Sequence, residues 1–140
     1  MFFPDVNVLV ALTIESHEHS AIAHDWYVDQ GRPVLVVCRH TQLGLLRFMT
    51  SVKHFPEDAV TNRAALVIYD KLLDAGRLEF RLEPAGLEDA VRRIADVPMK
   101  SPKVWSDAYL GAFATLLRLP LVTFDVALAG KTTGSILLRP

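Results

Sequence analysis

Three aspartates stand where the sequence pattern passes from an apolar strand to a helix or turn. Asp5 follows "MFFP", Asp125 ends "LVTFD", and Asp107 lies in the opening turns of the helix predicted for "SPKVWSDAYLGAF". A carboxylate beside a hydrophobic strand costs several kcal/mol, to order of magnitude, unless something compensates its charge. Three such groups brought together would repel one another and raise their pKa values, unless a divalent cation lay between them. Convergence of these three would therefore predict a metal site.

The available ligands determine which metal to expect. Carboxylate oxygens suit Mg²⁺ or Mn²⁺, whose remaining positions are usually filled by water and substrate phosphate. Zinc is disfavoured because His17, His19 and His24 do not have the spacing of a shared site, and we assign them to the surface. A hard dication beside a phosphodiester lowers the pKa of a bound water and supplies a hydroxide nucleophile. The predicted reaction class is phosphodiester hydrolysis.

Each aspartate taken alone also has an ordinary explanation. Asp5 could cap the first helix. Asp107 could be an acidic first-turn residue, favoured by the helix dipole by about 0.3–1 kcal/mol. Asp125 could belong to a turn before "VALAG". The metal hypothesis depends on the three together.

The elements that must position these acids alternate along the chain. Strands rich in β-branched residues and helices with apolar residues at helical spacing predict a parallel sheet with helices on both sides. The carboxyl ends of parallel strands then share one edge, where ligands collect. Within the helices we predict that Ser16 is a cap and that Trp26, Val28 and Val67 face inward. The predicted strands span 2–5, 32–38, 78–83, 121–125 and 135–139, and the predicted helices 7–14, 16–31, 40–52, 57–76, 86–97 and 101–119.

Length and composition fit one globular domain over residues 1–140. About half of the residues are hydrophobic (51%) and 22% are charged, and the net charge of −1 excludes a global positive field that would attract a polyanion. Contact with nucleic acid must then come from local basic patches. No apolar run approaches the ~18 residues of a membrane span, Cys38 is read as a buried strand thiol, and we expect a cytoplasmic protein with no membrane contact.

Three segments together resemble the PIN-domain ribonucleases, and among them the VapC toxins of bacterial toxin–antitoxin pairs. They are "FPDVNVLVAL", "CRHTQLGLLRFMT", and "KVWSDAYLGAFA" with "LVTFD". The resemblance spans nearly the whole chain. It implies an α/β/α sandwich around a central parallel sheet and Mg²⁺- or Mn²⁺-dependent cleavage of RNA. The metal would be held by Asp5, Asp107 and Asp125.

The resemblance also implies roles for polar neighbours of the acids. Asn7 would form a hydrogen bond near Asp5, while Ser106 and Thr123 would offer hydroxyls that orient carboxylates. Ser106 as a helix-start residue and Thr123 as an ordinary strand residue are the competing explanations.

The chain departs from the family pattern at two places. Many members carry a glutamate on the helix after the second strand, where this chain has Gln42 or Gly44. Another acid often follows the last aspartate, but here Val126 and Ala127 follow Asp125. Gln42 offers a carbonyl oxygen without charge. We therefore expect weaker metal binding, with one well-held ion.

Basic residues near the predicted site are candidates for RNA phosphate contacts, which supply most non-specific affinity. They are Arg39, Arg47, Lys100 and Lys103. The competing explanation for any one of them is an ordinary solvated charge. The aromatic residues Trp26, Trp105 and Tyr109 are expected in the core or at an interface, because apolar residues surround each of them.

The resemblance further implies a VapB-type antitoxin that covers the cleft, and a homodimer. The apolar segment "LVIYDKLL" would be consistent with dimerisation, or it could be core. Two alternatives stay open. One is a PIN-like binding module without catalysis, which the missing acids favour, and the other is a metal-dependent phosphodiesterase or nuclease acting on a substrate other than RNA.

Overall fold

Five short parallel strands form the centre of the molecule. The computed structural model describes residues 1–139. Hydrogen-bonded ladders join the strands in the orders β1-β4-β5 and β2-β3, and a bridge between Phe2 and Leu35 links the two groups beside β1. The combined order is β3-β2-β1-β4-β5. The chain adds β2 and β3 on one side of β1 and then β4 and β5 on its other side, and all strands stay parallel. The strands are β1 (Phe3–Pro4), β2 (Leu35–Val37), β3 (Leu78–Phe80), β4 (Leu121–Thr123) and β5 (Ile136–Leu137).

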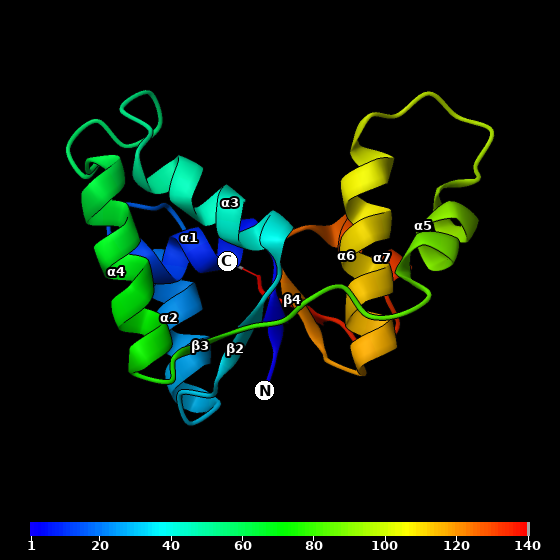
Figure 1. Cartoon of the computed structure of the whole chain (residues 1–140), viewed down its shortest axis with the longest axis horizontal. Helices are drawn as coiled ribbons and strands as arrows, with labels where there is room; N and C mark the ends of the chain where they lie inside the picture. Colours follow the sequence, from blue (N-terminus) through cyan, green and yellow to red (C-terminus); the bar gives the residue numbers. More distant parts are fainter. Residues whose placement is uncertain (140) are drawn as a thin grey trace.

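Helices cover both faces of this sheet, which confirms the predicted α/β/α sandwich (Figure 1). Successive residues of β2 point to opposite layers: Leu35 and Val37 pack in one core cluster, and Val36 packs in the other with Phe3. One side carries α1 (Val6–Thr13), α2 (Ser20–Asp29), α3 (Arg39–Met49) and α4 (Asn62–Asp74). The other carries α5 (Leu87–Ala95), α6 (Lys103–Leu117) and α7 (Val126–Lys131).

The largest differences from the predicted element boundaries concern α2, α4 and α7. Helix α2 begins at Ser20, and Ser16 is not its cap, because the Ser16 hydroxyl donates to the Asp58 carboxylate. Helix α4 begins only at Asn62, where the hydroxyl of Thr61 accepts the Ala64 N–H at 3.2 Å. Residues 126–131, expected as a turn, form the short helix α7.

Burial agrees with the sequence prediction at Cys38 and disagrees at two valines. Cys38 is fully buried at the end of β2. The prediction that Val28 and Val67 face inward was wrong: their exposed fractions are 52% and 47%. Both lie on helices that cover the outside of the sheet, so only one face of each helix is buried. Among the described residues no helix is both long and apolar enough to cross a membrane.

Helix α1 reaches the sheet edge with the help of a close helix contact. A Cβ placed on Gly44 of α3 would lie 2.5 Å from Cγ2 of Val6, the first residue of α1. Only a residue without a side chain allows this approach. Gly44 therefore lets α3 press against the start of α1, directly after Asp5.

Candidate functional site

Asp5 ends β1 and begins α1, and its carboxylate is held on both sides. It is 5% exposed. Its Oδ1 accepts the Val8 N–H at 2.9 Å, which caps α1, and its Oδ2 accepts the Thr123 hydroxyl at 2.5 Å. Burial raises the pKa of Asp5, the negative charge of Asp125 acts in the same direction, and the two hydrogen bonds oppose the shift. The cap explanation for Asp5 thus holds together with its place at the sheet edge.

Thr123 connects the ends of β1 and β4. Its side chain is fully buried, and besides donating to Asp5 it accepts the backbone N–H of Asp125 at 2.9 Å. These strands are hydrogen-bonded neighbours, so their carboxyl ends lie at one edge. Sequence reasoning expected a hydroxyl that orients carboxylates, and the Thr123 contacts match that description.

Asp125 ends β4 and caps α7. Its Oδ1 accepts the backbone N–H groups of Ala127 and Leu128 at 2.8 and 3.0 Å, and its Oδ2 accepts a hydrogen bond from the Lys103 ammonium. The Lys103 contact lowers the pKa of Asp125, so this carboxyl group stays ionised. Asp125 is therefore a helix cap and not only a turn residue, and its Oδ2 faces the Lys103 ammonium.

Asp107 joins this edge from α6, in the second turn rather than the first. It is 7% exposed, and its Oδ2 lies 3.6 Å from Nζ of Lys131 at the end of α7. Gly111, one turn further along α6, lies beside Thr132: a Cβ there would be 3.0 Å from the Thr132 hydroxyl. The small residue brings the end of α7 close to α6, which places Lys131 next to Asp107.

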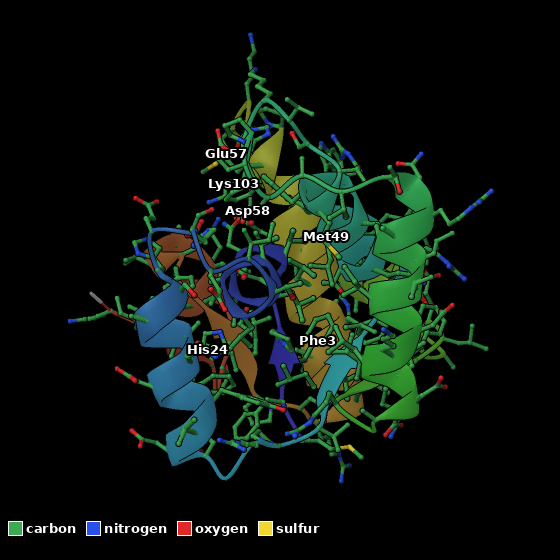
Figure 2. All side chains as sticks on the ribbon, turned by 90° about the vertical axis from the view of Figure 1, so that its left-hand side faces the viewer. Phe3, His24, Met49, Glu57, Asp58 and Lys103 are labelled. Carbon is green, nitrogen blue, oxygen red and sulfur yellow. The ribbon has the colours of Figure 1, made fainter. Side chains whose placement is uncertain are left out.

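Lys103 is the electrostatic centre of the site. Its hydrogen bond with Asp125 raises its pKa most, and the negative charges of Asp107, Asp125 and Asp5 add to the shift. Figure 2 shows Lys103 toward one end of the molecule and Phe3 inside it. The Lys103 ammonium therefore lies where the charges of all three aspartates raise its pKa.

The three carboxylates are the kind of ligand that a hard divalent cation prefers, but in this structure they do not lie close enough together to share one ion. All three acids offer oxygen, and they carry three negative charges against the two ammonium groups of Lys103 and Lys131. Within residues 1–139, however, no three acidic, histidine or cysteine side chains lie close enough to hold one ion. Two of the three carboxylates are instead paired with lysines, Asp125 with Lys103 and Asp107 with Lys131. The prediction of three ligands at one ion stays a prediction, which requires Lys103 to leave Asp125.

Other predicted site residues lie elsewhere. The Asn7 side chain is exposed, and it is the backbone of this residue that contributes to the pKa of Asp5. Gln42 accepts a hydrogen bond from Arg39, and the Ser106 hydroxyl donates to the Lys103 carbonyl at 3.1 Å. Among these described contacts neither Gln42 nor Ser106 reaches a carboxylate. At Ser106 the ordinary helix-start explanation matches the observed contact.

The four basic candidates divide by position. Lys103 belongs to the acidic edge itself, and Lys100 lies just before α6. Arg39, at the start of α3, has its guanidinium carbon 4.8 Å from the Phe80 ring centre, and Arg47 is exposed in the last turn of α3. Lys131 was missed by sequence reasoning, because nothing in the spacing "DVALAGK" predicts that this short helix folds back onto α6.

Tyr109 and Trp26 pack against other aromatic residues, as predicted, whereas Trp105 is not part of the core. Tyr109 is half-buried and stacks with Phe113, with ring centres 6.1 Å apart, and Trp26 packs edge-on against Phe2 at 5.4 Å. Trp105 is 64% exposed, because it lies on the outer face of α6, opposite the buried Val104 and Asp107 side.

Comparison with known proteins gives consistent matches. The family model of the PIN domain matches residues 2–131. The chain is 37% identical over 132 residues to Ribonuclease VapC41 of Mycobacterium tuberculosis, covering 91% of this chain and 90% of that protein. It is 31% identical over 122 residues to Ribonuclease VapC38 of the same species, covering 86% and 82%.

A solved structure has the same fold. The crystal structure of PAE2754 from Pyrobaculum aerophilum aligns with a TM-score of 0.61 at 23% sequence identity, covering 96% of this chain and 81% of that one. At this identity the likeness concerns the fold alone.

Proposed function

Because the chain belongs to the PIN-domain family, as a ribonuclease of the VapC type, we propose that it is a toxin that hydrolyses RNA phosphodiester bonds with the help of Mg²⁺ or Mn²⁺. The observation that supports this most directly is the acidic edge. Asp5 and Asp125 end neighbouring strands, and Asp107 faces the same group of charges from α6. The strand order reverses at β1, the place where ligands bind in open parallel sheets.

Asp5, Asp107 and Asp125 would hold the divalent cation, whose chemistry is to polarise the phosphodiester and lower the pKa of a water. The protein's own part is orientation and charge. Thr123 and the Val8 N–H fix the plane of the Asp5 carboxylate, and the α7 backbone fixes that of Asp125. The carboxylate planes of both aspartates are thus fixed in advance, while Lys103 must leave Asp125 before a cation can bind there.

Lys103 and Lys131 supply the positive charge that an RNA phosphate would meet at this edge. Their side chains are 55% and 50% exposed, so each ammonium is free to turn from its aspartate toward a phosphate oxygen. A cation bound by the carboxylates would repel both ammonium groups and favour that exchange. Arg39, Arg47 and Lys100 would contact further phosphates along the RNA strand.

The proposed partners are a VapB-type antitoxin and a second copy of the chain. Support for self-association comes from α4, which buries Ala65 and Tyr69 but leaves Leu66 and Val67 52% and 47% exposed. Apolar side chains exposed together on one helix are typical of a contact surface. The segment "LVIYDKLL" is therefore partly core and partly surface.

A binding module without catalysis is the second candidate. Two observations favour it: two of the three acids already have ammonium partners, and Gly44 leaves no room for an acid at that position. Such a protein would keep its fold and antitoxin contact while failing to cleave RNA.

Cleavage of a panel of single-stranded RNAs separates the candidates. We expect cleavage with Mg²⁺ or Mn²⁺, none with EDTA, and none by Asp5→Asn, while Asp70→Asn on the exposed face of α4 cleaves normally. Equal cleavage by wild type and Asp5→Asn would point to a contaminating nuclease. A folded wild-type protein that cleaves no RNA would support the binding module, and cleavage of DNA alone would move the activity to a non-RNA substrate.

A further inference from the structure

A hollow beside Trp105 adjoins the cavity that contains Asp107, and the proposed function does not use it. Its volume is about 660 Å³. It lies between the end of α5, the 96–102 loop and the first turn of α6, and its lining includes Arg92, Asp96, Met99, Lys100, Pro102 and Trp105. This size is within the range of small-molecule sites in proteins.

We propose that this hollow binds an unpaired base of the RNA substrate, stacked on Trp105, next to the cavity that contains Asp107. The inference rests on the proposed ribonuclease function and names the substrate class it takes: single-stranded RNA. Sequence-independent recognition of single strands combines an aromatic ring, on which a base stacks, with basic side chains that follow the phosphates.

Exposure of Trp105 is the first observation that carries this proposal. An indole that is 64% exposed, next to a Met99 that is also 64% exposed, is a large apolar surface left in water. Trp105 follows Lys103 by two residues and precedes Asp107 by two. Its ring therefore lies in the same two turns of α6 as Lys103 and Asp107 but on the opposite side of the helix.

The hollow also adjoins the acidic site directly. A second cavity, of about 280 Å³, contains Asp107 and Lys131, and the two cavities share Val97, Met99 and Val104 as walls. A nucleotide whose base lies against Trp105 therefore needs to pass only this shared wall to bring its phosphate toward Asp107.

One lysine at this surface is available for contact with a phosphate. The hollow carries two cationic side chains, Arg92 and Lys100, against one acid, Asp96. Arg92 forms an ion pair with Glu88 at 2.6 Å, whereas Lys100 has no ion pair among residues 1–139. An unpaired lysine that lines the same hollow as an exposed indole could contact the phosphate of a nucleotide whose base stacks on the indole.

Tryptophan fluorescence tests this without cleavage. Single-stranded RNA oligonucleotides are titrated into the full-length protein in EDTA, and binding is followed by quenching and independently by anisotropy of labelled RNA. We expect stacking to quench the emission and Trp105→Ala to weaken binding by about 5- to 100-fold, the range for removing one base–aromatic stack. Trp105→Phe keeps a ring and should bind close to wild type with the quenching lost.

Control variants separate stacking from other effects. Lys100→Ala should lower the slope of log affinity against log salt by about 0.7, while Lys71→Ala, exposed on α4, should leave it unchanged. Cleavage and circular dichroism are measured on the same samples.

The outcomes are distinguishable. Unchanged RNA affinity and cleavage in Trp105→Ala would overturn the inference and leave the ribonuclease function standing. Quenching and a Trp105-dependent affinity without any cleavage would support the inference and overturn the catalytic function. A change in oligomeric state of Trp105→Ala, with RNA affinity unchanged, would assign the surface to protein contact and overturn the inference.

Discussion

Replacing Asp5 with asparagine should stabilise the metal-free protein while abolishing its activity. Asp5 is 5% exposed, and burial raises the pKa of its carboxyl group, which means that the folded state disfavours the charged form. Asparagine has nearly the same shape and no charge. It keeps an oxygen for the Val8 N–H, so α1 remains capped.

The magnitude follows from what is lost and gained. The cost of the buried charge disappears, while the Thr123 oxygen accepts the new amide N–H and the buried Thr123 O–H loses its acceptor, which offsets part of the gain. A net gain of about 1 kcal/mol is typical for removing a destabilising site residue. For a chain of this size that corresponds to a Tm rise of about 3–4 °C.

The stability gained by Asp5→Asn should increase with pH. Because the folded-state pKa of Asp5 lies above its ordinary value of 3.8, the folded protein binds the proton more tightly than the unfolded chain. The destabilisation by Asp5 is therefore absent below the unfolded value, grows as pH rises through the window between the two pKa values, and is complete above the folded one. The gain from Asp5→Asn should follow the same course.

The assay is thermal unfolding in EDTA across this pH range, for wild type, Asp5→Asn and the exposed control Asp70→Asn. The reasoning is refuted if Asp5→Asn lowers Tm at neutral pH, or if its gain persists undiminished in acid. Asp70→Asn should stay within about 0.5 kcal/mol of wild type at every pH.

Three further predictions concern the contacts around this site. Lys103→Ala should bind Mn²⁺ several-fold more tightly than wild type, because it removes an ammonium that competes for the carboxylates; Lys100→Ala serves as control, and calorimetric titration measures both. Gly44→Ala should lower the free energy of unfolding in urea by about 1–3 kcal/mol through its clash with Val6, and adding Val6→Ala should restore most of the loss. Thr123→Val should cost about 1–3 kcal/mol because it leaves buried polar partners unsatisfied, whereas Thr123→Ser, measured in the same urea experiment, should cost less.

The layers of the fold and the edge that carries the acids could be predicted from sequence. Continuous β-branched runs such as "VLVVC" indicate strands covered on both faces, and strand–helix alternation then places the residues after β1 and β4 at one edge. The function of Asp5 as a helix cap was also foreseeable, because aspartate after a strand and before a helix is a common cap, whereas Asp125 was expected in a turn and caps the short helix α7.

The pairing of acids with lysines could not be predicted in the same way. Lys103 precedes Asp107 by four residues, so helical spacing places them on one face of α6, but its partner proved to be Asp125, 22 residues away. Lys131 reaches Asp107 only because Gly111 lets α7 approach α6. Long-range packing of this kind leaves no local periodicity.

Trp105 was misplaced for a related reason. Apolar neighbours in "KVWSDAY" predicted burial, yet the Trp105 side chain is 64% exposed on α6. Periodicity identifies a buried stripe but not which large residues remain outside it.

Calorimetric titration of Mn²⁺ into the wild-type protein and into Asp5→Asn, Asp107→Asn and Asp125→Asn tests the central claim most directly. We predict one ion per chain in the wild type and an affinity at least about tenfold weaker in each variant, with Asp89→Asn on the exposed face of α5 unchanged. Absence of binding to the folded wild-type chain, or an affinity that none of the three substitutions alters, would contradict a shared cation at this edge of the sheet.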